Sequence, residues 1–363
     1  MEMNPNFRLD GRSYDRDELL DLRLADSDHS TPEWKREILS FIHLFLDSSK
    51  GEITQYTSGT TGDPGRHLLL RESMWQSARK TLEFFKLVPG DRVLMCLPIR
   101  YIAGKMMVVR ALVGGLDLIL TEPSGRPLRE LSQPVSFAAM VPLQVHESLV
   151  HGDNLSRISK LIIGGGEIGY TSKKVLACLN QTVVFESFGM TETYTHFALR
   201  RISGETPDAG FRLLDGVTIS QDHRDCLVVN VKGVTQGPIT TNDLVEIDPS
   251  GSSFKWLGRY DHVINTGGIK VIPELLEEQI RNSIGCDCLL LSEPDERLGS
   301  KLILVVETSQ DDPPVKEWLT RLKSFLSPYE IPKRVITMKE IPRNLSMKPD
   351  RKATQKIVST QFN

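Results

Sequence analysis

A run of small, hydroxylated and glycine residues near the start of the chain is suited to wrap a polyphosphate. It reads YTSGTTGDPG from Tyr56 to Gly65. Glycine lets backbone N–H groups turn inward without a Cβ clash, and hydroxyl groups can donate to phosphate oxygens. The Walker pattern is excluded, because Asp63 and Pro64 follow Gly62 where that pattern requires Lys and then Ser or Thr. The run therefore predicts a nucleotide-binding loop of another kind, with an ordinary turn between a strand and a helix as the alternative. The candidate phosphate contacts are Thr57, Ser58, Gly59, Thr60, Thr61 and Gly62.

Two further motifs follow this loop. IGGGEI spans Ile163 to Ile168, and SFGMTET spans Ser187 to Thr193. In this order the three motifs resemble those of the adenylate-forming superfamily of acyl- and aryl-CoA ligases, luciferases and peptide-synthetase adenylation domains. The resemblance implies catalytic roles for Thr191, beside the α-phosphate, and Glu192, as a Mg²⁺ ligand, and carboxylate oxygen suits that hard cation. It also implies nucleotide contacts from Gly165, Gly166, Glu167, Ser187, Phe188 and Gly189, and acyl contacts from Gly164 and Gly165.

The resemblance continues between the two halves of the chain. TTNDL resembles the segment whose aspartate accepts hydrogen bonds from the ribose hydroxyls, here Asp243. WLGRYDHVI resembles the segment that supplies a ribose and phosphate contact, here Arg259, and a hinge between two domains, here Asp261. A surface arginine and aspartate in a linker are the alternative for the second segment.

Two motifs of the last hundred residues complete the series. NTGGIKV, from Asn265 to Val271, resembles the loop that lines the thiol channel after domain rotation, which implies CoA contacts from Gly267, Gly268 and Lys270. EIPRNLSMKPDR resembles the segment with the mobile catalytic lysine, here Lys348. A compact ammonium on a long stem suits this role, because it can bridge the carboxylate and the α-phosphate as charge develops. A solvated lysine is the alternative.

The acyl substrate is indicated by the stretch LPIRYIAGKMMVVRALVGG, from Leu97 to Gly115. It is similar to the corresponding stretch of o-succinylbenzoate-CoA ligases of menaquinone biosynthesis, in which an arginine follows the glycine by six residues, as Arg110 follows Gly104 here. That acid has two carboxylates, of which one is activated, and a guanidinium can bind the other through two parallel hydrogen bonds. A solvated helix face is the alternative for Arg110. Tyr101 occupies the place of the family's aromatic-gate histidine.

Several positions depart from the family pattern. The usual lysine of the phosphate loop is missing, and Arg66 stands nearby. Met347 replaces the glycine before the catalytic lysine. About fifty residues precede the phosphate loop, fewer than the family norm. We therefore expect a compact or divergent member of the superfamily.

The pattern of apolar residues predicts the elements that hold these motifs. From residues 51 to 190, short β-like runs alternate with helical patterns, which is typical of a mostly parallel sheet flanked by helices, with ligands at the carboxyl ends of the strands. From residues 195 to 258, short strands predict a small antiparallel or barrel-like subdomain. A mixed α+β pattern follows. The predicted division is an N-terminal helical segment of the large domain, made of two polar helices (1–50), the ATP- and acyl-binding part of the large domain (51–259) and a small mobile domain (262–363), with the hinge at about 260–261.

Composition limits the class of partner. The chain has 363 residues, with 47 acidic and 44 basic side chains and a net charge of −3, so a general affinity for nucleic acid or anionic membranes is not expected. No apolar run approaches the roughly 20 residues of a membrane span, and we expect a cytoplasmic location. The spacing of the five cysteines favours reduced, structural thiols over a zinc site or disulfides.

The combined prediction is an AMP-forming acid–thiol ligase. It would use ATP and Mg²⁺ to convert o-succinylbenzoate into an acyl-adenylate and transfer the acyl group to coenzyme A. Another aryl- or acyl-CoA ligase is the first alternative, and a non-catalytic nucleotide-binding protein of the same fold is the second. The expected partners are small molecules, and a homo-oligomer is left open.

Overall fold

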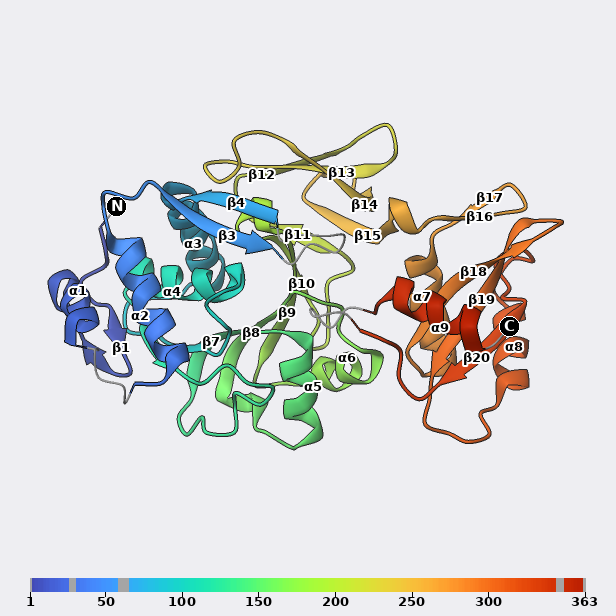
Figure 1. Ribbon diagram of the computed structural model, residues 1–363, viewed down its shortest axis with the longest axis horizontal. Helices are drawn as coiled ribbons and strands as arrows, with labels where there is room; N and C mark the ends of the chain where they lie inside the picture. Colours follow the sequence, from blue (N-terminus) through green and yellow to red (C-terminus); the bar gives the residue numbers. More distant parts are fainter. Residues whose placement is uncertain (1, 26–30, 58–64, 344–348, 362–363) are drawn as a thin grey trace.

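The computed structural model describes residues 2–25, 31–57, 65–343 and 349–361 of the chain. A large and a small domain lie side by side along the long axis of the molecule (Figure 1). Their apolar cores are separate, because one cluster of buried side chains runs from Phe7 to Phe254 and two others lie between Val271 and Val358. Strand β15 (Ser253–Arg259) and a short turn (Tyr260–His262) connect the two domains.

A sheet of thirteen strands is the frame of the large domain. Its parallel part contains, in order across the sheet, β1 (Arg8–Leu9), β6 (Asp117–Leu120), β5 (Arg92–Met95), β7 (Val135–Met140), β8 (Ile158–Ile163) and β9 (Val183–Gly189). The helices associated with these strands are α3 (Arg71–Phe85), α4 (Ile102–Gly114), α5 (Pro142–Val150) and α6 (Tyr170–Ala177). The predicted alternation of strands and helices is confirmed. The loops that follow β7, β8 and β9 consequently lie at one edge of the sheet.

Antiparallel strands extend the same sheet beyond β9. They are, in spatial order, β10 (His196–Arg201), β11 (Phe211–Leu213), β15, β14 (Ile239–Ile247), β13 (Cys226–Val231) and β12 (Val217–Gln221). The prediction of short antiparallel strands is confirmed, but β10 is hydrogen-bonded to β9, so these strands are continuous with the main sheet. A tight turn between Gly189 and His196 reverses the chain and makes the two strands neighbours.

The N-terminal segment differs from the two polar helices that the sequence predicted. Helices α1 (Arg16–Ala25) and α2 (Glu33–Leu46) are present, but β1 and β2 (Arg12–Ser13) precede them and form the edge of the large sheet. Helix α2 buries Ile38, Ile42 and Phe45, which share one helical face. This segment is therefore part of the core of the large domain.

A hairpin of β3 (Glu52–Thr57) and β4 (Gly65–Leu70) borders the predicted phosphate loop. Its two strands form a separate small sheet, and β4 leads directly into α3. The loop thus connects two paired strands, and the terminal pair of their register is Thr57 with Gly65.

The small domain has a three-stranded sheet of β18 (Cys288–Asp295), β19 (Gly299–Glu307) and β20 (Arg334–Met338). Its other elements are α7 (Pro273–Ile284), α8 (Val315–Lys323), α9 (Arg351–Gln361) and a hairpin of β16 (Ile264–Thr266) and β17 (Ile269–Val271). Helix α7 has a proline in its first turn and ends at Gly285, whose φ of 78° is a conformation that glycine adopts without strain. Within the described residues, no helix has both the length and the apolar composition needed to cross a bilayer.

Candidate active site

Two glycines allow close approaches at the end of β9, Gly164 between the loop after β8 and β9, and Gly189 within the turn from β9 to β10. A Cβ atom at Gly164 would lie 2.3 Å from the Oγ of Ser187, and this hydroxyl donates to the carbonyl oxygen of Ile163 at 3.2 Å. A Cβ atom at Gly189 would lie 2.4 Å from the carbonyl oxygen of Thr195. Gly165 has a φ of 82°. A larger residue at Gly164 would push the loop after β8 away from β9, and one at Gly189 would disturb the turn between β9 and β10.

A short 3-10 turn, Thr191–Thr193, presents the TET motif at this edge of the sheet. The hydroxyl of Thr193 accepts from the backbone N–H of Met190 at 3.0 Å and donates within the turn, which fixes its shape. Glu192 is exposed, and its role as a Mg²⁺ ligand remains a prediction. Tyr194, with a φ of 65°, accepts from the backbone N–H of Leu70 at 3.0 Å and so connects the turn to the hairpin that borders the phosphate loop.

The aromatic residue of this motif belongs to the core. Phe188 packs against Phe197, Phe211 and Phe254, with ring centroids 5.2–5.7 Å apart. Edge-to-face packing of this kind holds the end of β9 in place. Because the ring is packed against other side chains, the nucleotide contact predicted for Phe188 would come from its backbone atoms.

The predicted ribose and hinge residues lie together. The Nε1–H of Trp256 donates to Oδ1 of Asp243 at 3.0 Å, and Nη1 of Arg259 lies 3.8 Å from the same oxygen. Arg259 also donates to both carboxylate oxygens of Asp261, at 3.0 and 3.4 Å. Burial opposes the charge of Asp261, but the hydrogen bonds from Arg259 hold its pKa below the usual value. Arg259 therefore connects the predicted ribose acceptor to the predicted hinge.

Arg110 lies inside the large domain, which excludes a solvated helix face. Its side chain is 2% exposed, and burial lowers its pKa to about 9. Its Nη2 donates to the hydroxyl of Thr195 at 2.8 Å, while its Nε has no hydrogen-bond partner. Within the described part of the chain, no carboxylate forms an ion pair with this guanidinium. A buried donor without a partner costs about 1–3 kcal/mol. The contact of Arg110 with the acyl substrate remains a prediction.

A hydrogen-bonded chain extends from Arg110 through two residues that the sequence analysis missed. Nδ1 of His196 lies 3.2 Å from the Thr195 hydroxyl, and its Nε2 lies 3.4 Å from the hydroxyl of Thr81. A neutral imidazole that accepts at Nδ1 and donates at Nε2 satisfies both contacts. Burial, assisted by the charge of Arg110, lowers the pKa of His196 well below its usual value. Thr195 and His196 follow the TET motif after Tyr194, and this position was the available signal.

Tyr101 lies at the start of α4, the helix that carries Arg110. It directly precedes the helix, is 40% exposed and stacks with Arg100, whose Cζ is 4.9 Å from the ring centroid. Its proposed place in the acyl site remains a prediction.

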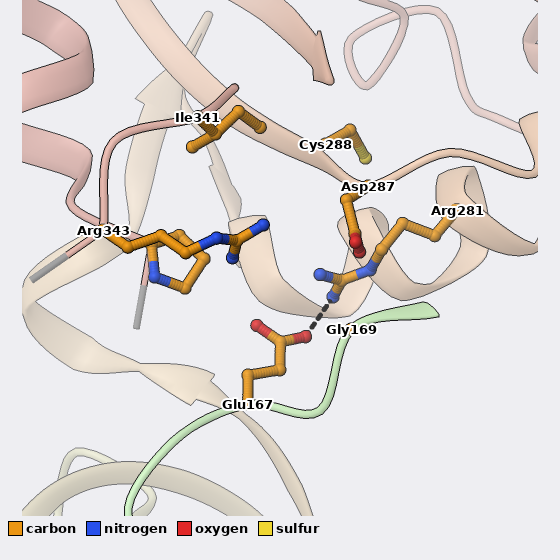
Figure 2. Close-up of a pocket in the computed structure, with 8 residues that line it drawn as sticks. Glu167, Gly169, Arg281, Asp287, Cys288, Ile341 and Arg343 are labelled. Atoms are coloured by element: carbon orange, nitrogen blue, oxygen red, sulfur yellow. Dashed lines mark ion pairs between the residues drawn. The ribbon is translucent and has the colours of Figure 1, made fainter. Parts of the chain in front are cut away.

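Glu167 contacts the small domain. Its Oε1 lies 2.6 Å from Nη2 of Arg281 on α7 (Figure 2). The same interface has a small hollow lined by Glu167, Gly169, Arg281, Asp287, Cys288, Ile341, Arg343 and Pro349. Arg343 and Pro349 form a β-bridge with each other and flank residues 344–348. Lys348 itself lies outside the described residues, as do Ser58 to Gly62, and their roles remain predictions.

The predicted CoA-channel residues lie far from the glycine turn at Gly164 to Glu167. The β16–β17 hairpin lies at the far end of the small domain (Figure 1). The backbone N–H of Gly267 donates to the carbonyl oxygen of Leu298 at 2.9 Å, and Lys270 is exposed. A Cβ atom at Gly268 would meet no atom within 4 Å. This arrangement brings the segment next to Lys348 to the large domain, and it leaves the hairpin remote.

The sequence and the fold place this chain among known enzymes. The family model for AMP-binding enzymes matches residues 25–233, and the chain belongs to that family of adenylate-forming ligases. A 2-succinylbenzoate–CoA ligase of Listeria monocytogenes is 27% identical over 356 residues, which span 90% of this chain and 73% of the relative.

Solved structures agree with this membership. An acyl-CoA synthetase (AMP-forming)/AMP-acid ligase II-like protein from Dyadobacter fermentans is 32% identical, with a TM-score of 0.63, and the match covers 92% of this chain and 97% of the other. Wild-type E. coli MenE, solved with an analogue of OSB-AMS, is 20% identical, with a TM-score of 0.68 and coverage of 85% and 69%, and shows the shared fold.

Proposed function

We propose that this enzyme joins o-succinylbenzoate to coenzyme A in two steps at one site. The observation that carries this proposal is the buried guanidinium of Arg110, which has no carboxylate partner among the described residues and lies one hydrogen bond from the loop of the TET motif. An acid with a second, unreacted carboxylate would supply that partner. The Listeria relative named 2-succinylbenzoate–CoA ligase supports this acid.

In the first step, the succinyl carboxylate of the substrate attacks the α-phosphorus of ATP. A P–O bond forms to the acid, the bond to the β-phosphate oxygen breaks, and pyrophosphate leaves. Lys348, Thr191 and the hydroxyl loop would donate to the oxygens that gain charge. Asp243 would accept from the ribose hydroxyls, held in place by Trp256.

The donor set fits Mg²⁺ bound mainly by the nucleotide. Mg²⁺ commonly keeps waters and substrate phosphates and takes only one or two carboxylates from the protein. Glu192 is an exposed carboxylate on the TET turn, and the described residues contain no cluster of three or more metal-ligating side chains. When bound, the ion would neutralise charge on the phosphates.

In the second step, the CoA thiol loses its proton and attacks the acyl carbonyl carbon. A C–S bond forms, the C–O bond to the phosphate breaks, and AMP leaves. We propose that the small domain first rotates about Asp261, which withdraws Lys348 and brings Gly267, Gly268 and Lys270 to the thiol. One active site would then perform both reactions.

The test measures pyrophosphate release from ATP and Mg²⁺ with single acids, with and without CoA. The panel contains o-succinylbenzoate, benzoate, 4-phenylbutyrate, a short dicarboxylate and a long-chain fatty acid. We expect the highest kcat/KM with o-succinylbenzoate and a thioester product only when CoA is present. Preference for another acid would change the substrate assignment, and no release with any acid would favour a nucleotide-binding protein without ligase activity.

A further inference from the structure

A buried cation of the small domain is neutralised by the large domain. Arg281 on α7 has a side chain that is only 12% exposed, and its Nη2 lies 2.6 Å from Oε1 of Glu167, which follows β8. Burial alone would lower the pKa of Arg281, but Glu167 and nearby acidic groups raise it above its usual value. Within the described residues, Arg281 forms one ion pair, and its partner is Glu167. Separating the domains would remove its partner.

A second contact caps a helix from the opposite domain. Helix α6 begins at Tyr170, and Gly169 at its N-cap has no side chain to satisfy the first N–H groups. Oδ1 of Asp287, which directly precedes β18 of the small domain, accepts from the backbone N–H of Tyr170 at 3.2 Å. A carboxylate at this end also interacts favourably with the helix dipole. A Cβ atom at Gly169 would lie 3.2 Å from Oδ2 of Asp287, so glycine allows the close approach.

The two contacts lie beside Arg343 and Pro349. Arg343 and Pro349, which flank residues 344–348, line the same hollow as Glu167 and Arg281 (Figure 2). On the next turns of the two helices, Lys173 lies 3.8 Å from Glu278. The small domain is thus held against the glycine turn by α6, α7 and the start of β18.

We propose that Arg281 and Asp287 are positioning residues for the adenylation step. They hold the small domain where the segment next to Lys348 faces the glycine turn, and both contacts break before the domain rotates for thioester formation. This inference rests on the proposed two-step function. Because the proposed rotation breaks both contacts, we expect their removal to shift the population toward the rotated arrangement.

The direct test is single-molecule fluorescence energy transfer between dyes at positions 150 and 325. Both native side chains, Val150 and Phe325, are exposed and lie on different domains. The background carries Cys178→Ser and Cys286→Ser. We expect one dominant transfer efficiency in the parent protein and a shift of about fivefold in the population ratio in Arg281→Gln. The matched control is Arg321→Gln, because Arg321 is an exposed arginine whose contacts, with Glu317 and the carbonyl of Ser283, stay within the small domain.

Exchanging the two charges of the ion pair separates its loss from misfolding, and the measurement does not depend on catalytic activity. Arg281→Glu should shift the population further, and adding Glu167→Arg should restore the parent distribution. This measurement requires no acid to be activated, so it distinguishes failure of the contact from failure of the proposed function. An unchanged distribution of transfer efficiency in both Arg281→Gln and Arg281→Glu would overturn the proposal.

The two half-reactions give a second readout. Arg281→Gln should slow adenylate formation by about fivefold and leave thioester formation from a supplied acyl-adenylate unchanged or faster. Asp287→Ala should change both rates in the same directions. Equal loss in both half-reactions would indicate a merely structural role and would overturn the assignment.

Discussion

The guanidinium of Arg110 donates to the hydroxyl of Thr195 at 2.8 Å, so its short hydrogen bond goes to a neutral group. A second carboxylate of the substrate would complete the charge balance of this site. Thr195 also contacts His196, and the protonation state of that imidazole is therefore linked to the proposed acyl site.

His196 should make the stability of the protein depend on pH below 6.5. The folded state keeps the imidazole neutral because its pKa is well below the usual value, whereas the unfolded chain takes up a proton near pH 6.5. The unfolding free energy should therefore fall by about 1.4 kcal/mol per pH unit below 6.5 from this residue alone. Denaturant unfolding of wild type and His196→Gln at pH 7.5, 6.5 and 5.5 measures the difference. Parallel pH profiles of the two proteins would contradict the neutral, buried imidazole.

Lys348→Ala should abolish adenylate formation and largely preserve CoA transfer from a supplied acyl-adenylate. Loss of one preorganised charge contact typically costs about 10²- to 10³-fold in rate. Lys352→Ala, on the exposed side of α9, is the control. The assays are pyrophosphate release and thioester formation. If both half-reactions declined equally, the model of two arrangements would be wrong.

Asp261→Pro should spare adenylation and block thioester formation, because proline fixes φ at the proposed hinge. The substitution also removes the pair with Arg259, and Asp261→Ala is the matched control that removes the pair but leaves φ free. Both half-reaction rates are measured for both variants. Normal thioester formation in the proline variant would place the hinge elsewhere.

Asp243→Asn should raise the KM for ATP by roughly tenfold to a hundredfold, since a hydrogen bond to a charged acceptor is worth about 1.5–3 kcal/mol. Trp256→Phe should raise it less, because it removes the donor that orients the carboxylate and leaves Arg259 in place. The KM for the acid should hardly change in either variant. An unchanged KM for ATP in Asp243→Asn would remove this residue from the ribose site.

The sequence predicted the sheet, the helices and the order of the motifs because those depend on local patterns. Alternating β-like and helical runs predicted β5 to β9. That side chains would clash at Gly164 and Gly189 is visible only in the structure. The burial of Arg110 could not be predicted, because its apolar neighbours on α4 are compatible with either face of a helix. Burial depends on the packing of α4 against the rest of the domain.

Long-range contacts account for the remaining differences. The carboxylate of Glu167 pairs with Arg281, more than a hundred residues later, and its predicted nucleotide contact stays a prediction. The continuity of β10 with β9 likewise depends on one turn rather than on strand propensity. Neither relationship leaves a periodic signal in the sequence.

The proposed contact between Arg110 and the carboxylate that is not activated is measured by a cycle of two enzymes and two acids. The measurement is kcat/KM of wild type and Arg110→Ala with o-succinylbenzoate and with 4-phenylbutyrate, which lacks the ring carboxylate. We predict a strong increase in the KM for o-succinylbenzoate in the variant, little change in the KM for ATP, and a much smaller penalty for the missing carboxylate than in wild type. Arg110→Lys should restore only part of the lost affinity for o-succinylbenzoate, because an ammonium group cannot form the two parallel hydrogen bonds of a guanidinium. Equal losses with both acids would contradict the claim and would return the substrate to an unspecified aryl or acyl acid.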